Sequence, residues 1–429
     1  MKLLLSIILF LARAAQAGEP WPLSGAAADY DPLLERIGDA RLVLLGEATH
    51  GSREFHVERA RLTRRLVEEK GFDAVVWEAA WEPVRRVDAH VRSDGNDADA
   101  AAALAGFVRF PRWMWRNAEV RDFVAALRAM NATRDGQAPV RVFGMDLYSV
   151  PESADAVVRE VARDSIDAAA RARAGYRCFD DYLPEPQFYG RDAVAGRIRS
   201  CAAGAAAQQE VMAGRARDAA GGAAAEDAFA AWQSARVVAA GEAYYRTMYR
   251  SNIDSWNLRE RHMADTLAQL LDHLERQRGR PAKLVVWAQN IHQGDARATD
   301  QAALGEVSLG QLMRERHGAA AVLVAFTTWR GTVRAATGWG EADRLWDLLP
   351  ALPESWSGRL HAMQPPDAKG FLLWLRDVPA FAGQRLERAV GVAYEPDTER
   401  ASHYFNMRLG RQFDAVVHID VTQAVTPLR

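Results

Sequence analysis

The chain has 429 residues, of which 49% are hydrophobic and 26% charged, and its formal net charge is −2. This composition is typical of a globular protein and argues against a disordered or a membrane-embedded chain. The near-neutral charge gives no sign of a nucleic-acid partner or an anionic membrane partner. A chain of this length can bury a large core in two or three domain-sized units.

Residues 1–17 have the pattern of a secretory signal peptide. Lys2 precedes an apolar stretch of about ten residues, and an Ala-Gln-Ala sequence at 15–17 fits a cleavage site. The alternative, a membrane anchor, is disfavoured because the stretch is too short to span a bilayer of about 30 Å. We therefore expect a periplasmic or secreted protein without a membrane span. Removal of Lys2 and Arg13 with the peptide changes the net charge from −2 to −4.

Residues 18–150 alternate short apolar runs with helical patterns, as the first part of an α/β core does. Gly71 directly follows the longest helical pattern and is a stop signal for it. The predicted strands are 41–45, 74–77 and 140–143, and the predicted helices are 53–70, 82–92 and 117–130.

Residues 151–282 lack strand patterns and are rich in alanine, which predicts a helical insertion lying over the carboxyl ends of the strands. Its predicted helices are 190–217, 223–250 and 254–279, with a connection near 213–226. Residues 283–429 return to the core, with predicted strands at 284–288, 321–326, 389–394 and 413–419. The predicted fold class is α/β, with a mainly parallel sheet and flanking helices.

Cys178 and Cys201 are the two cysteines of the chain. Export would permit a disulfide between them, worth on the order of 3 kcal/mol for a loop of this size. Two independent buried thiols are the alternative, because the sequence does not give their geometry. Two cysteines are too few for a cysteine-based structural zinc site.

Several of the strand-like runs end in residues that can carry out acid–base chemistry. In α/β sheets, ligands bind outside the carboxyl ends of the strands. We therefore expect side chains from distant segments to meet at one rim of the sheet, as in an enzyme. The residues at these ends are Glu47, His50, Glu78, Asp146, Gln289 and His292.

Arg59 stands where the helix 53–70 should carry an apolar residue. Phe55, Arg59, Leu62 and Leu66 follow the helical repeat and share one stripe. A buried guanidinium needs a carboxylate, and Glu78 is the predicted partner. Alternatively, Arg59 bends out to solvent along its aliphatic stem or makes a purely structural ion pair.

Glu47 and His50 are three residues apart between Gly46 and Gly51, glycines that permit a sharp turn. A carboxylate beside an imidazole orients it and raises its basicity, as a general base acting on water requires. A capping turn with a surface histidine is the alternative.

Two further strand-end residues have open roles. Gln289 can donate a hydrogen bond but cannot carry a proton. Asp146 either orients a histidine or caps the following helix.

Four further residues are weaker candidates for substrate binding. Trp115 would line a pocket, although aromatic residues are more often part of the core. Asn257 and Arg259 would face the crevice or solvent, and His403 lies in a polar cluster that also fits structural support. The chain has no Gly-x-Ser-x-Gly elbow, no Walker loop and no His-Glu-x-x-His motif.

Five segments together resemble the erythromycin esterase family, from about residue 40 to 420. They are Gly-Glu-Ala-Thr-His-Gly at 46–51, Trp-Glu at 77–78, Trp-Asn-Leu-Arg at 256–259, Trp-Ala-Gln-Asn-Ile-His at 287–292 and Glu-Arg-Ala-Ser-His-Tyr at 399–404. The resemblance implies an α/β core and a helical region closing over a deep cleft. It also implies hydrolysis of a small-molecule carboxylic ester or lactone by an activated water, without metal or cofactor.

By position, the resemblance makes His50 the general base and His292 the second histidine. Glu47 and Glu78 would orient and polarise, and Arg59 would anchor a carboxylate or the developing oxyanion. Gln289 departs from the family pattern His-Asn-x-His, in which a histidine stands at this position.

Three functional hypotheses follow from these residues. The first is an ester hydrolase with His50 as base. The second is a metal-dependent hydrolase with Glu47, His50 and His292 as ligands. The third is a non-catalytic binding protein that keeps the cleft, because Gln289 replaces a histidine. The sequence identifies neither the substrate nor the oligomeric state.

Overall fold

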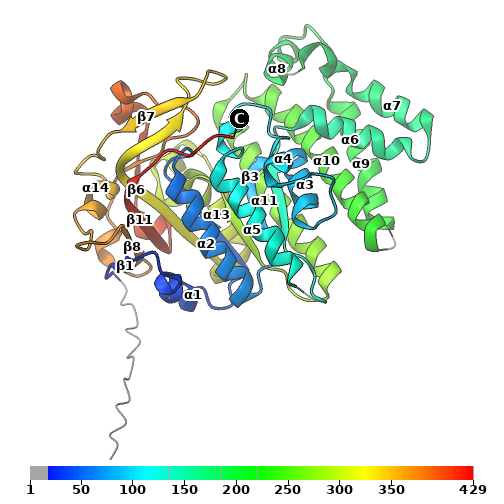
Figure 1. Cartoon of the computed structure of the whole chain (residues 1–429). Helices are drawn as coiled ribbons and strands as arrows, with labels where there is room; N and C mark the ends of the chain where they lie inside the picture. The colour runs from blue at the N-terminus through cyan, green and yellow to red at the C-terminus, as the bar shows by residue number, and fades with distance from the viewer. Residues whose placement is uncertain (1–17, 135, 184, 220, 429) are drawn as a thin grey trace, which may run out of the picture.

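The computed structural model describes residues 18–134, 136–183, 185–219 and 221–428 (Figure 1). The predicted signal peptide, residues 1–17, lies outside the described residues. Within those ranges, no helix is both long and apolar enough to cross a membrane.

A mixed sheet forms the centre of the molecule, and within the described residues it has nine strands in the order β1-β8-β11-β6-β2-β5-β3-β4, with β7 paired to β6. The six neighbours from β11 to β4 run parallel, whereas β1, β7 and β8 are antiparallel additions. The predicted fold class is therefore confirmed. The strands are β1 Trp21–Leu23, β2 Leu42–Leu45, β3 Ala74–Ala80, β4 Arg141–Asp146, β5 Leu284–Trp287, β6 Ala321–Ala335, β7 Arg344–Leu348, β8 Gly370–Trp374 and β11 Ala415–Thr422.

Helices cover both faces of the sheet, so its central strands are buried on both sides. In β2, Val43 and Leu45 belong to one core, and Leu42 and Leu44 belong to the other. The first core includes α2 (Arg53–Lys70) and α5 (Ala118–Ala132), and the second includes α11 (Asn252–Arg278), α13 (Leu309–His317) and α14 (Trp356–His361). α1 (Asp31–Ile37), α3 (Trp81–Val91) and α4 (Ala100–Leu104) complete the core helices.

The region between β4 and β5 is helical in its described residues and has a hydrophobic core of its own. Figure 1 shows α6 to α9 beside the sheet rather than in front of it. The residues of this region that line the cavity at the strand ends come from the start of α6 and of α11. The helices are α6 Val150–Ala162, α7 Ile166–Tyr176, α8 Pro186–Val194, α9 Ala202–Asp218, α10 Gly222–Thr247 and α11.

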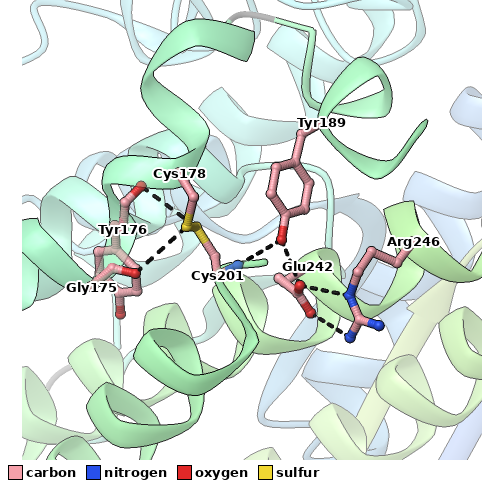
Figure 2. Close-up of a disulfide and its surroundings, with 7 residues drawn as sticks. All are labelled: Gly175, Tyr176, Cys178, Tyr189, Cys201, Glu242 and Arg246. Carbon is pink, nitrogen blue, oxygen red and sulfur yellow. Dashed lines mark hydrogen bonds and ion pairs between the residues drawn. A yellow bond between two sulfur atoms is a disulfide. The ribbon is translucent and has the colours of Figure 1, made fainter. Parts of the chain in front are cut away.

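A disulfide between Cys178 and Cys201 ties α9 to the end of α7, with the two Cα atoms 5.7 Å apart (Figure 2). The hydroxyl of Tyr189 accepts a hydrogen bond from the backbone N–H of Cys201 and donates one to Glu242 on α10. Arg246 in turn donates to Glu242. The structure therefore has the disulfide rather than two free thiols.

Two of the sequence-based elements are wrong. The single helix predicted over 190–217 is broken into α8 and α9, and Gly196 in the break has a φ of +70°, which favours glycine and ends a helix. The strand predicted at 389–394 is a crossing segment, since Val390 pairs with Thr49 and Ala393 with Ala336. The nearby strands are β9 (Arg385–Arg388) and β10 (Tyr404–Met407), which form a separate ribbon.

Candidate active site

A cavity of about 260 Å³ lies at the carboxyl ends of the parallel strands. The strand-end side chains named from the sequence meet there, except Glu47, which lies directly behind His50. The lining residues predicted from the sequence are His50, Glu78, Trp115, Asp146, Arg259, Gln289 and His292.

His50 follows β2 and is held by Glu47. Its Nδ1 lies 2.9 Å from Oε1 of Glu47, whose side chain is fully buried. Burial alone would raise the pKa of Glu47, but Arg59 and His50 outweigh it and lower this pKa below its usual value. Because a carboxylate only accepts hydrogen bonds, Nδ1 of His50 is the donor in this pair, and Nε2 is the ring atom left to act on a water. His50 is thus arranged as a base.

The glycines that flank this turn are needed for close packing rather than for an unusual backbone conformation. Neither Gly46 nor Gly51 has a positive φ. A Cβ on Gly46 would collide with the side chain of Asn290, and one on Gly51 would collide with the backbone of Arg334. The turn therefore lies tightly against β6 and the segment after β5.

Arg59 is fully buried on α2, but its partner is Glu47 and not Glu78 as predicted. Its Nη2 donates to Oε2 of Glu47 at 2.6 Å, and its guanidinium lies over the ring of Trp287. Arg59 is not among the residues that line the cavity. Its position behind Glu47 does not fit the implied role of anchoring a substrate carboxylate or oxyanion.

Arg259, on α11, is the cavity-lining guanidinium that binds the carboxylates at the strand ends. It donates to Glu78 at 2.8 Å and to Asp146 at 2.6 and 3.0 Å. Burial opposes ionisation of Glu78, yet His292 and Arg259 together lower its pKa well below the usual value. Asp146 also accepts a hydrogen bond from the backbone N–H of Leu147, so it stabilises the turn after β4 and binds Arg259 at the same time.

His292 lies between two carboxylates. Its Nδ1 is 2.5 Å from Glu260, and its Nε2 is 3.1 Å from Glu78. Its ring stacks on Trp256 with the centroids 4.7 Å apart. Burial opposes the charged form, but Glu260 and then Glu78 raise the pKa of His292 to about 9. The two carboxylates therefore favour the imidazolium form of His292 at neutral pH, although Nη1 of Arg259 also lies 3.2 Å from Nε2, and Glu260 is a site residue that sequence analysis missed.

Gln289 is 3% exposed and also lines the cavity. Its backbone N–H donates to Glu78 at 2.9 Å. Its side-chain Nε2 has no hydrogen-bond partner within the described residues. The amide is thus held in place by its backbone while its side chain keeps free hydrogen-bonding capacity.

Two predicted binding residues lie elsewhere. Asn257 hydrogen-bonds to the backbone of Gly305 and Val307 and faces away from the cavity. His403 accepts from the N–H of Glu395 in the polar cluster near the C-terminus. Both side chains therefore bind the backbone of a neighbouring loop instead of reaching the cavity.

The walls of the cavity are largely aromatic and apolar. Trp115 stacks on Trp77 with the centroids 5.0 Å apart, and Trp339, 62% exposed, contacts Phe110 and Tyr148 at the entrance. Much of one wall comes from residues 106–115, of which the sequence analysis named Trp115 alone. The wall residues include Pro83, Phe107, Val108, Phe110, Pro111, Met114, Trp115, Tyr148, Trp256, Ile291, Trp339 and Val392.

The metal-ligand set considered from the sequence does not come together. Both carboxylate oxygens of Glu47 are taken by His50 and Arg59, and both ring nitrogens of His292 face carboxylates. In the part of the chain that the structure describes, no three His, Cys, Asp or Glu side chains are grouped as a metal site requires.

Solved structures share this fold at low sequence identity. A succinoglycan biosynthesis protein is 21% identical, with 95% of this chain and 96% of that chain covered and a TM-score of 0.77. A Bacillus cereus protein is 19% identical, with 96% and 97% covered and a TM-score of 0.76. An erythromycin esterase mutant in its open conformation is 16% identical, with 93% and 94% covered and a TM-score of 0.63.

Sequence comparison adds the family. Erythromycin esterase type II of Escherichia coli is 32% identical over 79 residues, which are 18% of this chain and only 19% of that protein. Residues 67–422 match the family described as erythromycin esterase, so most of the chain is covered. The chain therefore belongs to the erythromycin esterase family, a family of hydrolases.

Proposed function

We propose that this protein hydrolyses carboxylic esters or lactones by means of a water activated by His50. The observation that carries the proposal is the Glu47-oriented imidazole of His50 lining an apolar cavity that it shares with the protonated His292. A neutral imidazole with a free Nε2 can remove a proton from water as the water attacks a carbonyl carbon.

The opposite part of the cavity suits the charge that then develops on the carbonyl oxygen. His292 and Arg259 are cations fixed by carboxylates, and preorganised cations and N–H donors stabilise an oxyanion. When the tetrahedral intermediate collapses, the C–O bond to the leaving alcohol breaks. The proton taken up by His50 then passes to the departing alkoxide, so the base is restored and one water is consumed.

Gln289 fits this scheme without a proton of its own to transfer. His50 carries the proton in both steps, and the unpartnered amide of Gln289 can donate a hydrogen bond to the carbonyl oxygen. The charged lining residues are Arg109, Arg112, Arg259 and His292 against Glu78, Asp146 and Glu152, and Glu260 behind His292 brings the sum of formal charges to zero. With apolar walls, this balance favours an uncharged substrate over an anionic one.

The test is a screen of the purified protein on neutral aryl and alkyl esters and on lactones that include erythromycin. His50→Ala should lower kcat/KM by at least about 100-fold, because a general base contributes about 10²–10⁴. His317→Ala, a change on α13 outside the cavity, is the matched control and should leave kcat/KM unchanged. Full activity of the His50→Ala protein would exclude the proposal, and loss of activity with a chelator would favour the metal-dependent alternative.

A non-catalytic binding protein is the second candidate, and Gln289 at the position of a family histidine is the observation that favours it. In that case, the wild-type protein should bind esters without turnover, and Gln289→His should create hydrolysis. A wild-type protein that turns over any ester of the screen excludes this second candidate.

We also propose that the protein is periplasmic or secreted. The signal-like sequence at 1–17 and the disulfide, which forms and persists in oxidising compartments, support this location. Cell fractionation of a C-terminally tagged chain tests it, with deletion of residues 2–17 as the control that should keep the protein in the cytoplasm.

A further inference from the structure

A second groove, of about 600 Å³, runs between α10 and α11 and shares no lining residue with the active-site cavity. The floor on α10 carries Ala239, Ala240 and Ala243, whose small side chains leave the space open. Arg236 on α10 and His262 on α11 line the same groove. Neither of these two groups takes part in the proposed hydrolysis.

Arg236 is a half-buried cation with no acidic partner. Its Nη1 donates to Gln233 at 2.6 Å and to Thr266 at 3.3 Å, both uncharged side chains. No carboxylate of the described residues forms an ion pair with it, although the buried Arg59 and Arg141 each have one. Burial lowers the pKa of Arg236 to about 10, so its charge is held at a cost in free energy. Its Nε and Nη2 remain available as donors.

His262 is 7% exposed, and its imidazole has no hydrogen-bond partner among the residues described. Its ring nitrogens are not among the fully buried polar atoms that lack a partner, so they reach the groove and can bond to what fills it. Burial, followed by the charges of Arg236 and Arg259, lowers the pKa of His262 well below its usual value. The ring is therefore neutral at neutral pH, with one N–H to donate into the groove.

We propose that the groove between α10 and α11 binds a small oxyanion, with the anion accepting hydrogen bonds from the guanidinium of Arg236 and the imidazole of His262. The shared ligand chemistry is that of a carboxylate or a phosphate, whose oxygens match the donor fork of arginine. Binding would supply the missing partner of both groups in one step. The negative charge of the anion would also offset the charges of Arg236 and Arg259, which disfavour the protonated form of His262.

The other charged groups that face the groove allow this ligand. Asp265 is already paired with Arg316 at 2.8 Å, and Asp254 is exposed in the first turn of α11. Arg261 is an exposed cation at the rim. The charged lining groups are Arg236 and Arg261 against Asp254 and Asp265, and because Arg316, which lies outside the lining, neutralises Asp265, the cations are in excess by one, which favours an anion.

The test uses the full-length protein with ¹³C-labelled histidine, and the His262 signal is identified by its loss in His262→Gln. Inorganic phosphate and acetate, each compared with chloride at equal ionic strength, are the two probes. Phosphate or acetate should raise the pKa of His262 by at least about one unit, as a nearby opposite charge does, and should raise Tm. A response to only one probe assigns the groove to that anion.

Arg236→Met should weaken the responding anion at least about tenfold, because hydrogen bonds to charged groups are worth about 1.5–3 kcal/mol. Arg276→Met, which removes an exposed arginine of the neighbouring helix α11 outside the groove, is the matched control and should bind as the wild type does. If Arg236→Met does not fold, Arg236→Lys retains the charge but loses the fork and should still bind more weakly. Equal pKa and Tm in phosphate, acetate and chloride would overturn the proposal.

Discussion

Glu260 is the residue whose removal most directly tests the charge state of His292. In Glu260→Gln, the amide is nearly isosteric, but the carboxylate 2.5 Å from Nδ1 of His292 is lost. After burial, which opposes the charge, Glu260 is the largest influence on His292 and Glu78 the next. Loss of one close opposite charge should lower the pKa of His292 from about 9 by about 1–2 units.

The effect on catalysis follows from the protonated fraction. If His292 acts as an imidazolium, a pKa of about 7.5 in the variant costs about fourfold in kcat at pH 8 and about fifteenfold at pH 9 relative to the wild type. At pH 6 both proteins are protonated and should differ little from this cause. The assay is kcat from pH 6 to 10 on the best ester of the screen, with the exposed Glu35→Gln as control.

Stability provides an independent measurement of the same pair. The folded pKa of His292 lies above its unfolded value, so the stabilisation is fully present below about pH 6.5 and is lost as pH rises through about 9. This change is on the order of 3 kcal/mol in the wild type and should be smaller in Glu260→Gln, as measured by urea unfolding at pH 6 and pH 9.5. The reasoning would be refuted if the wild type and Glu260→Gln showed the same decrease of kcat at alkaline pH and the same pH dependence of the unfolding free energy.

Three further changes have defined outcomes. Arg59→Met leaves the buried carboxylate of Glu47 without its cation and should lower the free energy of unfolding in urea by about 3–5 kcal/mol. A loss of less than about 1 kcal/mol, as expected for an ion pair exposed to solvent, would contradict the buried pair. Gln289→Glu exchanges an N–H donor for an acceptor and should lower kcat for a neutral ester by about 10²–10³, with KM changing less, and an unchanged kcat would remove Gln289 from the carbonyl site. Reduction of the Cys178–Cys201 bond, which closes a separation of 23 residues, should lower the unfolding free energy by about 3.5 kcal/mol, and an unaltered urea midpoint in dithiothreitol would show that the bond adds nothing.

The order of strands and helices in the core could be predicted because the apolar residues of most buried segments follow the repeat of a helix or form the short run of a strand. Residues 53–70 show the helical repeat and end at a glycine, and α2 has these same bounds. The strands β1 and β7 were missed because they pair antiparallel at the edge or along one side, where burial does not impose a continuous apolar run, whereas β8 was missed although it is an interior strand with the apolar run Phe371–Trp374. Residues 389–394 are apolar and partly buried, with Val390 and Tyr394 fully so, although they cross between segments instead of forming a ladder.

The candidate site was predictable where an acid–base residue lies in the turn just after a strand, as His50 does after β2 and His292 does after β5. Glu260 was missed although the pattern that identified Arg59, a charged residue on the apolar stripe of a helix, was also present. It lies three residues before Met263 and seven before Leu267 on the buried stripe of α11, a place where a carboxylate needs a cation. The partner of Arg59 was misassigned because the sequence does not tell which of two nearby carboxylates is closer.

The position of β2 has a consequence for how the chain is made. This strand emerges from the ribosome early, yet its two neighbours in the sheet, β5 and β6, begin at Leu284 and Ala321. During synthesis its backbone N–H and C=O groups have no native partner until about two thirds of the chain exists, and the edge that pairs with β6 stays open until about three quarters exists. A translation product that stops before β5 would display an apolar strand open on both edges, which is a template for aggregation.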